Sequence, residues 1–341
     1  MKTSRRSFLE AAGTAGVAAA IGDVGDAAEN PNSETKVRRF SYIQIDVFTS
    51  RRLQGNPLAV FTDARGLSDS EMQAIARETN LQETTFIFPR DPAVEREHGV
   101  KVRIFIPGEE IPFGGHPTLG TAVVLRNRLI AARGSESPAD PGPDEISLDL
   151  KVGKIPVAFR KESSGHIFGE MHQVDPVFGP IHDRATVAAL AGLKPDDISD
   201  EWPIQTVSTG LPFAIVPIKR LSTLASLEPN LKKVRSYFGK ETLTDFYYIT
   251  RDTGNTDVGV RSRGIFSDGE DPATGSAAGC TAAWMVRYGI AKSGERVHIQ
   301  QGVEIKRPSQ IFVRAEKQGD RIVSVRVGGN AVEVAEGTFH L

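Results

Sequence analysis

The amino-acid sequence predicts an α+β protein built from two similar halves. Antiparallel-looking strand patterns with one or two helices in each half argue against a doubly wound sheet. Two unrelated short motifs also recur in the same order, and each recurs 155 residues further along the chain. A spacing shared by two motifs indicates an internal duplication, so we expect two lobes of related structure.

The first repeated motif is a strand-like run that leads into the start of a helix. In the first half the run at 100–107 precedes FGGHPTLGTAVV, and in the second half the run at 258–266 precedes GEDPATGSAAGCTAA. The alignment pairs His116-Pro117-x-x-Gly120-Thr121-Ala122 with Asp271-Pro272-x-x-Gly275-Ser276-Ala277. We expect Asp271 to be the helix N-cap and Pro272 to lie in the first turn. Such a helix start suits a carboxylate or a phosphate.

The second repeated motif is a glycine–proline turn before a strand. Gly55-x-Pro57-Leu58-Ala59-Val60 aligns with Gly210-x-Pro212-Phe213-Ala214-Ile215. Both motifs also occur as common turn and cap chemistry, but the shared spacing favours duplication. Glu83 precedes the strand-like TTFIF and has no acidic partner at this offset, because residue 238 is Phe.

The N-terminal segment differs in composition from the rest of the chain. Residues 1–30 contain SRRSFL and then a weakly apolar run rich in alanine and glycine, as in a twin-arginine export signal. The run is too short and too rich in glycine for a stable membrane span. We therefore expect an exported protein, periplasmic or otherwise extracytoplasmic, or a cytoplasmic one if this interpretation of the segment fails.

Composition shifts divide the remaining chain into lobes. We expect a linker at 31–39, an N-terminal lobe at 40–143 that ends in the linker-like RGSESPADPGP, and a C-terminal lobe at 144–325. The strands at 326–341 either extend the second lobe or return to the first. The expected helices include one opened by a capping box at Ser68 and Glu71, and others at 185–193 and 231–238.

Several function classes find no support in the sequence. The formal charge of −2 implies no nucleic-acid partner, and neither GxGxxG after a first strand nor GxxxxGK[ST] occurs. The seven histidines form no HExxH motif, so no metal site is expected. Cys280 is the single cysteine, which excludes an intramolecular disulfide; among small residues it is expected to be a buried packing residue.

Polar residues at the two predicted helix starts suggest a site. If the halves face each other, both helix N-termini point into one cavity, with His116, Thr121, Asp271 and Ser276 around it. An imidazole and carboxylates there could transfer protons, and Glu83 is the further candidate. Each residue also has a structural interpretation: Asp271 as an N-cap, His116 as a turn residue and Glu83 as a solvated loop carboxylate.

Four motifs in order carry a resemblance to a known family. QIDVFTSRRLQGNPLAVF, NLQETTF, FGGHPTLGTA and GEDPATGSA resemble the PhzF (phenazine biosynthesis-like) isomerase family over about residues 40–341. The resemblance implies the fold of diaminopimelate epimerase, with each half a mostly antiparallel sheet or barrel wrapped around a central helix. It also implies a homodimer that needs neither an organic cofactor nor a metal.

The resemblance also implies roles for single residues. Glu83 would be the general acid/base, His116 would hold or polarise the substrate, and Asp271 would position its amino or hydroxyl group. Substrate contacts are expected from Gly115, Thr121, Gly275 and Ser276.

We therefore expect a cofactor-independent isomerase that moves a proton within a small carboxylated substrate, with the export signal favouring a substrate other than the phenazine precursor. The alternatives are a racemase or epimerase that uses Asp271 and His116 as opposed bases, and a non-catalytic binding protein for small acids. A two-thiol racemase is disfavoured, since Cys280 is nine residues beyond Asp271.

Overall fold

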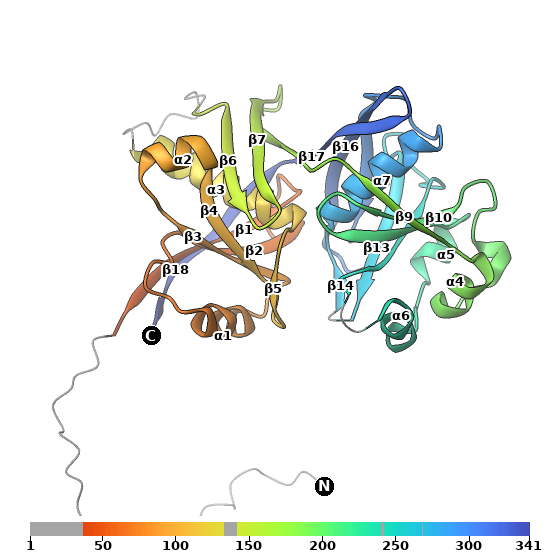
Figure 1. The fold of residues 1–341 in the computed structure, drawn as a ribbon, viewed down its shortest axis with the longest axis horizontal. Coiled ribbons are helices and arrows are strands. Elements are labelled where there is room, and N and C mark those ends of the chain that lie inside the picture. Colours follow the sequence, from red (N-terminus) through yellow and green to blue (C-terminus); the bar gives the residue numbers. More distant parts are fainter. Residues whose placement is uncertain (1–36, 133–141, 240–241, 268) are drawn as a thin grey trace, which may run out of the picture. The chain divides into compact units, whose positions relative to one another are not determined.

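The computed structural model describes residues 37–132, 142–239, 242–267 and 269–341, and residues 38–341 form one compact unit (Figure 1). The predicted export signal and most of the predicted linkers at 31–39 and 133–143 lie outside the described residues. The α+β class is confirmed. Within the described ranges, no helix has the length and apolar character needed to cross a membrane.

The first half builds its strands around one long helix. Its elements are β1 (Arg39–Val47), β2 (Asn56–Phe61), α1 (Asp69–Thr79), β3 (Glu83–Phe88), α2 (Pro92–His98), β4 (Val100–Phe105), β5 (Glu110–Ile111), α3 (Gly115–Ala132), β6 (Glu145–Leu150), β7 (Gly153–Lys161) and β8 (Ile167–His172). The predicted capping box of α1 is confirmed: the Ser68 hydroxyl accepts from the Glu71 N–H, and the Glu71 carboxylate accepts from the Ser68 N–H.

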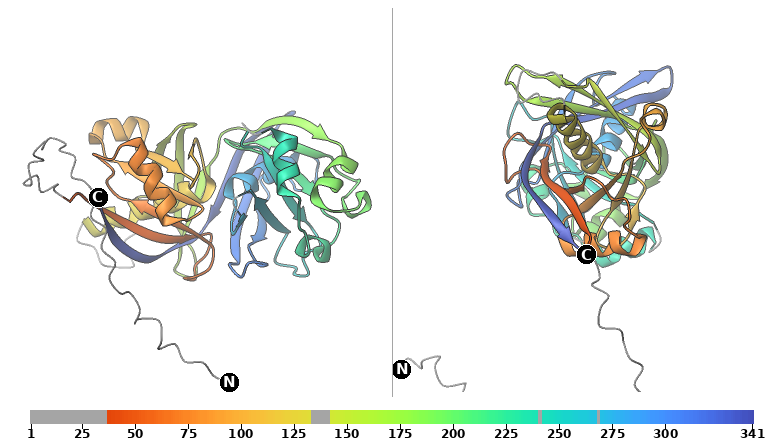
Figure 2. Two further views of the ribbon diagram at one scale, coloured as in Figure 1. Left: turned by 90° about the horizontal axis from the view of Figure 1, so that it is seen from below. Right: turned by 90° about the vertical axis from the view of Figure 1, so that its left-hand side faces the viewer.

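The central helix of the first half is α3. Its residues 115–124 are all buried, and it contacts β1, β2, β3, β6, β7, β8 and β18. The right-hand view of Figure 2 shows this helix with strands on every side. A helix that is apolar all round must be covered all round, which explains why strands wrap it.

The second half repeats this plan around α7 (Gly275–Arg287), whose residues 275–286 are buried. Its other elements are β9 (Val177–His182), α4 (Arg184–Ala191), β10 (Ile204–Ser208), β11 (Pro212–Pro217), α5 (Leu221–Ala225), α6 (Leu231–Phe238), β12 (Asp245–Thr250), β13 (Val260–Phe266), β14 (Gly269–Asp271), β15 (Val297–Gln301), β16 (Ser309–Gln318) and β17 (Arg321–Gly329). The last strand, β18 (Ala331–His340), returns to the first half. The helix α7 packs against β10, β11, β16 and β17.

The strand pairings are mixed, although mostly antiparallel as predicted. β2 and β3 run parallel, as do β4 and β6, β11 and β12, and β13 and β15. The parallel pairs occur at matching places in the two halves, which is the structural mark of the duplication.

The two lobes are not two consecutive segments of the chain, as the predicted boundaries would have them. β18 pairs with β1 along its whole length, from Arg39 opposite His340 to Val47 opposite Ala331. β6, β7 and β8 pack on α3 of the first half, although residues from 144 onward were expected in the second lobe. The strands β6, β7 and β8, which follow the predicted linker in the sequence, therefore cover α3.

The number of residues that separates equivalent positions of the two halves is not the same throughout the chain. In the β2/β11 region the 155-residue spacing holds, because Leu58 and Phe213 both begin a parallel pairing. At the helix starts the spacing is 160: Gly115 and Gly275 begin α3 and α7, and the pairing of Ile104 with Ile111 recurs as Gly264 with Asp271. The structural counterpart of His116 is thus Ser276, whereas Asp271 corresponds to Ile111.

This register corrects the expected cap of the second helix. Asp271 is the last residue of β14, and α7 begins four residues later, at Gly275, with Thr274 as its N-cap. Pro272 therefore lies in the connection before the helix and not in its first turn.

The starts of α3 and α7 touch through glycine. A Cβ added to Gly115 would overlap the backbone of Gly275, and one added to Gly275 would lie 3.0 Å from the Gly115 Cα. Only residues without a side chain allow two helix N-termini to approach this closely. The contact brings the first turns of both helices together.

We expect Gly115→Ala to destabilise the protein by about 1–3 kcal/mol, as overpacking of a close contact does. Urea unfolding followed by circular dichroism measures this. Gly108→Ala is the matched control, since no atom lies within 4 Å of a Cβ placed there. Equal midpoints for both variants would contradict a tight contact between the helix starts.

Candidate active site

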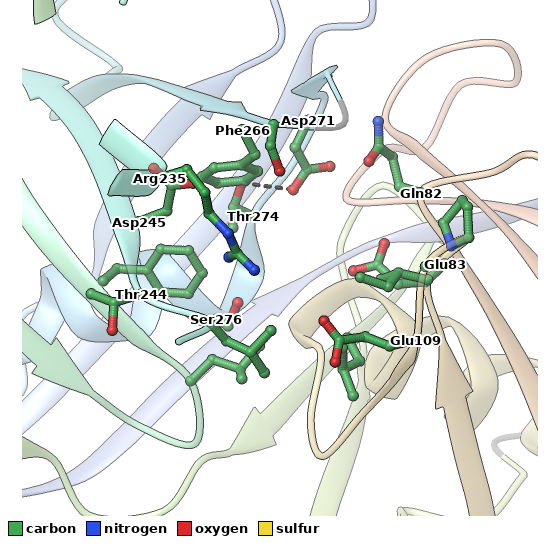
Figure 3. A pocket seen from close by; sticks show the side chains of 18 residues that line it. Gln82, Glu83, Glu109, Arg235, Thr244, Asp245, Phe266, Asp271, Thr274 and Ser276 are labelled. Carbon is green, nitrogen blue, oxygen red and sulfur yellow. Dashed lines mark hydrogen bonds between the residues drawn. The ribbon is translucent and has the colours of Figure 1, made fainter. Parts of the chain in front are cut away.

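A cavity of about 360 Å³ is lined by both halves of the fold. The first half contributes residues before β3 and around β5, and the second contributes residues from β11, α6, β12, β13, β14 and α7. Figure 3 shows Gln82, Glu83 and Glu109 on one side, with Arg235, Thr244 and Asp245 across from them. Such a concave site with a few polar groups is of the kind that binds small molecules.

Glu83 lines this cavity, and the buried His116, which is not part of the lining, contacts Glu83. Glu83 is the first residue of β3, and its Oε2 atom is 3.2 Å from Nε2 of His116 on α3. The side chain of Glu83 is 15% exposed and that of His116 is 2% exposed, so a substrate in the cavity would reach the carboxylate before the imidazole. The structure therefore brings together two of the residues that the sequence singled out.

Asp271 lies on the other wall of the site. Its Oδ2 atom accepts a 2.7 Å hydrogen bond from the Thr274 hydroxyl, and its Oδ1 accepts a 2.5 Å bond from the Asn56 amide. The Asp271 main-chain carbonyl accepts from Gln301. These contacts hold a buried carboxylate at the cavity wall in one orientation.

Asn56 connects the two sides of the site. It is fully buried at the start of β2, and its Nδ2 atom lies 3.0 Å from His116 Nδ1 and donates to Asp271. The Ala273 carbonyl lies 3.0 Å from the same nitrogen, whose two hydrogens are shared among these three acceptors. Asn56 was not among the predicted site residues; in the sequence it is the unspecified middle residue of the Gly55-x-Pro57 turn, within the motif QIDVFTSRRLQGNPLAVF.

The charge and the tautomer of His116 follow from the groups around the ring. Burial lowers the pKa of His116 to about 3, so the imidazole is neutral at physiological pH. An amide nitrogen can only donate, so His116 Nδ1 accepts from Asn56 and the ring proton is on Nε2. That nitrogen is the one that faces Glu83.

The predicted substrate-binding residues fall into two groups. Ser276 lines the cavity at the first turn of α7, and Gly115 and Gly275 bring the helix starts together. Thr121 does not line the cavity: it is buried and its hydroxyl is 2.9 Å from that of Thr85. The five-residue difference between the two spacings explains this error, because the counterpart of Ser276 is His116 and not Thr121.

Three charged residues of the cavity were missed by the sequence analysis: Glu109, Arg235 and Asp245. Asp245 begins β12 opposite Phe213, as Glu83 begins β3 opposite Leu58. Asp245 is therefore the structural counterpart of Glu83, which seemed to have no acidic partner. A single spacing could not reveal it, since the insertion between β11 and β12 moves it away from position 238.

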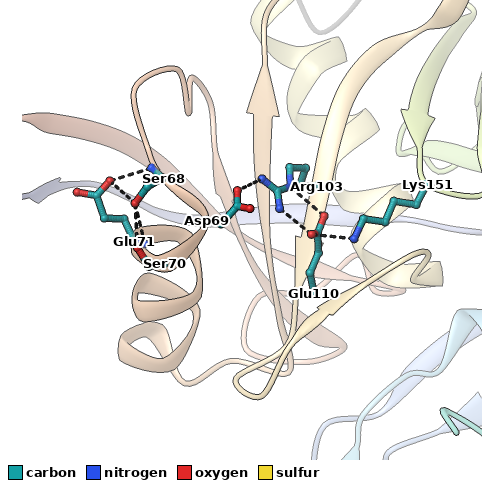
Figure 4. A network of polar contacts seen from close by, with 7 residues as sticks. All are labelled: Ser68, Asp69, Ser70, Glu71, Arg103, Glu110 and Lys151. Atoms are coloured by element: carbon teal, nitrogen blue, oxygen red, sulfur yellow. Dashed lines mark hydrogen bonds and ion pairs between the residues drawn. The ribbon is translucent and has the colours of Figure 1, made fainter. Parts of the chain in front are cut away.

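A polar network supports the cavity loop of the first half. Arg103 on β4 bonds Glu110 and Asp69, and Lys151 also contacts Glu110 (Figure 4). Gln73 of α1 donates to the carbonyls of Ile106 and Pro107. The loop between β4 and β5 is thus tied to α1 and to the β6–β7 turn.

Cys280 is the buried packing residue that the sequence indicated. Its side chain is inaccessible, and burial raises the pKa of the thiol to about 11. A thiol in that state is a poor nucleophile. Among the described residues, no group of three or more His, Cys, Asp or Glu side chains is placed to hold a metal ion.

The fold and its cavity define a duplicated two-lobed α+β protein with a site of the kind that binds small molecules. A sequence profile described as "Phenazine biosynthesis-like protein" matches residues 45–337. The chain is 34% identical over 308 residues to trans-2,3-dihydro-3-hydroxyanthranilate isomerase of Pseudomonas aeruginosa, covering 88% of this chain and 99% of that protein. The chain belongs to the phenazine biosynthesis-like family, and it is an isomerase.

Solved structures agree with this assignment. The crystal structure of a phenazine biosynthesis protein of the PhzF family from Bacillus anthracis has a TM-score of 0.75 and 26% identity, covering 89% of this chain and 99% of that one. A hydroxyproline epimerase from Agrobacterium vitis has a TM-score of 0.58 at 12% identity, covering 89% and 93%, which shows the fold alone. The expected diaminopimelate epimerase-like fold is confirmed.

The low pKa of His116 has a consequence for stability. Between pH 6.5, the ordinary histidine value, and about 3, the unfolded chain binds a proton at this residue that the folded protein does not. The free energy of unfolding should therefore fall as the pH drops through this window, by up to about 1.4 kcal/mol per pH unit.

Urea unfolding of wild type and of His116→Asn at pH 7, 6, 5 and 4.5 measures this contribution. The variant should lose less stability than wild type as the pH falls. His98→Asn, which changes an exposed histidine, should follow wild type. Parallel curves for wild type and His116→Asn would show that His116 is charged in the folded protein.

Proposed function

We propose that the protein is a cofactor-independent isomerase that moves a proton between two carbons of a small carboxylated substrate. The observation that carries this proposal is that Glu83, which lines the cavity together with Asp271, lies 3.2 Å from a buried, neutral His116. A carboxylate that is partly buried and reachable from a cavity is suited to both accept and return a proton.

The reaction would use one face of the substrate. The substrate carboxylate would bind at the first turn of α7, where Ser276 and the helix N-terminus favour an anion. Glu83 would remove a proton from a carbon acidified by conjugation, and the protonated carboxyl group, which can exchange with solvent, would deliver a proton to another carbon. His116 would hold the Glu83 carboxylate through its Nε2–H, and Asp271 would position an amino or hydroxyl group.

The geometry favours this reaction over racemisation. A racemase needs two bases on opposite faces of one carbon. The Asn56 amide nitrogen lies between His116 Nδ1 and Asp271 Oδ1, within hydrogen-bonding distance of both, so it occupies the place between these two groups that the carbon of a racemase substrate would need. A binding protein without catalysis would have no evident need for the contact between Glu83 and His116.

The substrate class is proposed from the relatives and from the cavity. The curated relative acts on trans-2,3-dihydro-3-hydroxyanthranilate, as its name states. A cavity of about 360 Å³ has room for a substituted six-membered ring with a carboxylate. We propose a substrate of this kind, with the compound itself as the first test and other cyclic or amino-acid-derived carboxylates after it. The homodimer that the family resemblance implied stays a prediction.

Glu83→Gln should abolish the incorporation of solvent deuterium into substrate and lower kcat by about 10²–10⁴-fold, because the amide cannot accept the proton. Binding should be largely retained, since the side chain keeps its shape. Incubation in deuterated buffer followed by mass spectrometry measures the exchange, and calorimetry measures the binding.

The matched control is Glu109→Gln, which removes a cavity carboxylate of the same lobe. It should keep most of the exchange rate. Exchange by Glu83→Gln at the wild-type rate would show that another group carries the proton.

We also propose that residues 1–30 direct export through the twin-arginine pathway. The support is the sequence SRRSFL followed by the apolar alanine-rich run. Replacing Arg5 and Arg6 by lysine should leave the protein in the cytoplasmic fraction, while the unchanged chain is exported. Cell fractionation with immunodetection measures this, and undiminished export of the double variant would refute the assignment.

A further inference from the structure

The backbone of the buried Asn56 is held by the turn that precedes it and by the strand pairing that it begins. The preceding Gly55 has φ +68° and no room for a side chain beside the Val47 carbonyl and Thr49. Arg307, between β15 and β16, donates to the carbonyls of Gly55 and Gln54. Asn56 then pairs with Val47 in the β1–β2 ladder. The fixed backbone therefore restricts the directions in which the Asn56 side-chain amide can point.

The Asn56 amide nitrogen contacts groups from both halves of the protein. On one side is Nδ1 of His116 at 3.0 Å, and on the other are the Asp271 carboxylate at 2.5 Å and the Ala273 carbonyl at 3.0 Å. The Oδ1 atom of Asn56 is buried with no hydrogen-bond partner among the described residues. The side chain thus acts as a donor, and its buried oxygen has lost its hydrogen bonds to water without gaining one within the described part of the chain, which is energetically unfavourable.

The second half of the protein shows that the fold does not need an asparagine here. The counterpart of Asn56 is Leu211, which stands in the same Gly-x-Pro turn two residues before Phe213. The duplicated strand forms equally well with leucine. The amide at position 56 therefore has a chemical use that the repeat without it lacks.

We propose that Asn56 is the positioning residue of the site: its amide sets the tautomer of His116 and, by the same group, orients Asp271. The donor at Nδ1 leaves the proton of the neutral ring on Nε2, which faces Glu83 Oε2 at 3.2 Å. The Glu83 carboxylate then faces an N–H group at a distance that a small shift would turn into a hydrogen bond. The effect of Asn56 on catalysis rests on the proposed function. The tautomer of His116 does not, because it is a property of the protein without substrate.

The other charged groups that face the imidazole are the carboxylates of Glu83, from β3, and of Asp271, from β14. Both would favour a protonated ring if they were the only neighbours. The amide that separates His116 Nδ1 from Asp271 prevents a direct contact between the imidazole and that carboxylate.

The test uses the full chain with ¹⁵N-labelled histidine and long-range ¹H–¹⁵N correlation spectra, in which the two neutral tautomers and the imidazolium have different nitrogen shifts. His116→Asn assigns the His116 signals. Wild type should show a proton on Nε2 only, unchanged from pH 5 to pH 8. A proton on Nδ1, or a charged ring, would overturn the proposal.

Two variants test the role of the amide. In Asn56→Asp, the new carboxylate accepts from the ring, so a proton should appear on Nδ1. In Asn56→Leu, which copies the residue of the other repeat, the preference for Nε2–H should be lost. With the substrate found for the wild type, both should lower kcat by about 10²–10⁴-fold. Asn330→Asp is the control, since Asn330 also donates to a carboxylate and a carbonyl, but outside the cavity lining.

If either folded variant keeps the wild-type tautomer together with the wild-type exchange rate, Asn56 is not the positioning residue. The spectrum of the wild type decides the tautomer even if both variants fail to fold. Full exchange by Glu83→Gln, with the tautomer as expected, would instead reject the proposed function and leave the assignment of Asn56 intact.

Discussion

The site depends on the contact between the N-termini of two buried helices. α3 and α7 meet where Gly115 and Gly275 leave no side chain between them. That contact places His116 and Ser276, the second residues of the two helices, on either side of the junction. A side chain at either glycine would push the helices apart and widen the distance between the polar groups of the two halves. The close approach is therefore a steric condition for the chemistry, and not only for packing.

Burial determines how the polar groups at this junction behave. An imidazole removed from water loses its affinity for a proton, and a neutral ring must have a donor on one nitrogen and an acceptor on the other. Asn56 supplies the donor at Nδ1, and the Glu83 carboxylate lies 3.2 Å from Nε2 without completing a hydrogen bond there. Asp271 is held separately by Thr274 and Asn56. A small set of hydrogen bonds thus keeps three ionisable side chains close together without requiring all of them to be charged.

The duplication explains why the site is asymmetric. Equivalent positions of the two halves carry different groups: Glu83 and Asp245, Asn56 and Leu211, His116 and Ser276. The fold needs only the shared features, which are the Gly-x-Pro turn, the parallel strand pair and a glycine at each helix start. The remaining positions are free to differ, so one half carries the residues of the proposed proton transfer and the other carries the proposed anion site. The charged residues that the second half adds to the cavity, Arg235 and Asp245, lie opposite Glu109 and Glu83 (Figure 3).

The sequence by itself determined the α+β class, the duplication, the family and most of the strands and helices, because these depend on local pattern: alternation, capping as at Ser68, and short motifs that persist in order. It also selected Glu83, His116, Asp271 and Ser276, all of which the structure brings to one site. Only the tertiary structure decided the register between the halves, since insertions change the spacing from 155 to 160 without altering either motif. For that reason Thr121 was misplaced, Asp271 was taken for a helix cap, and Asp245 went unnoticed. The role of Asn56 was likewise hidden, because its three contacts join residues that are 60, 215 and 217 positions away along the chain. Contacts at such separations are created by folding, and no local pattern encodes them.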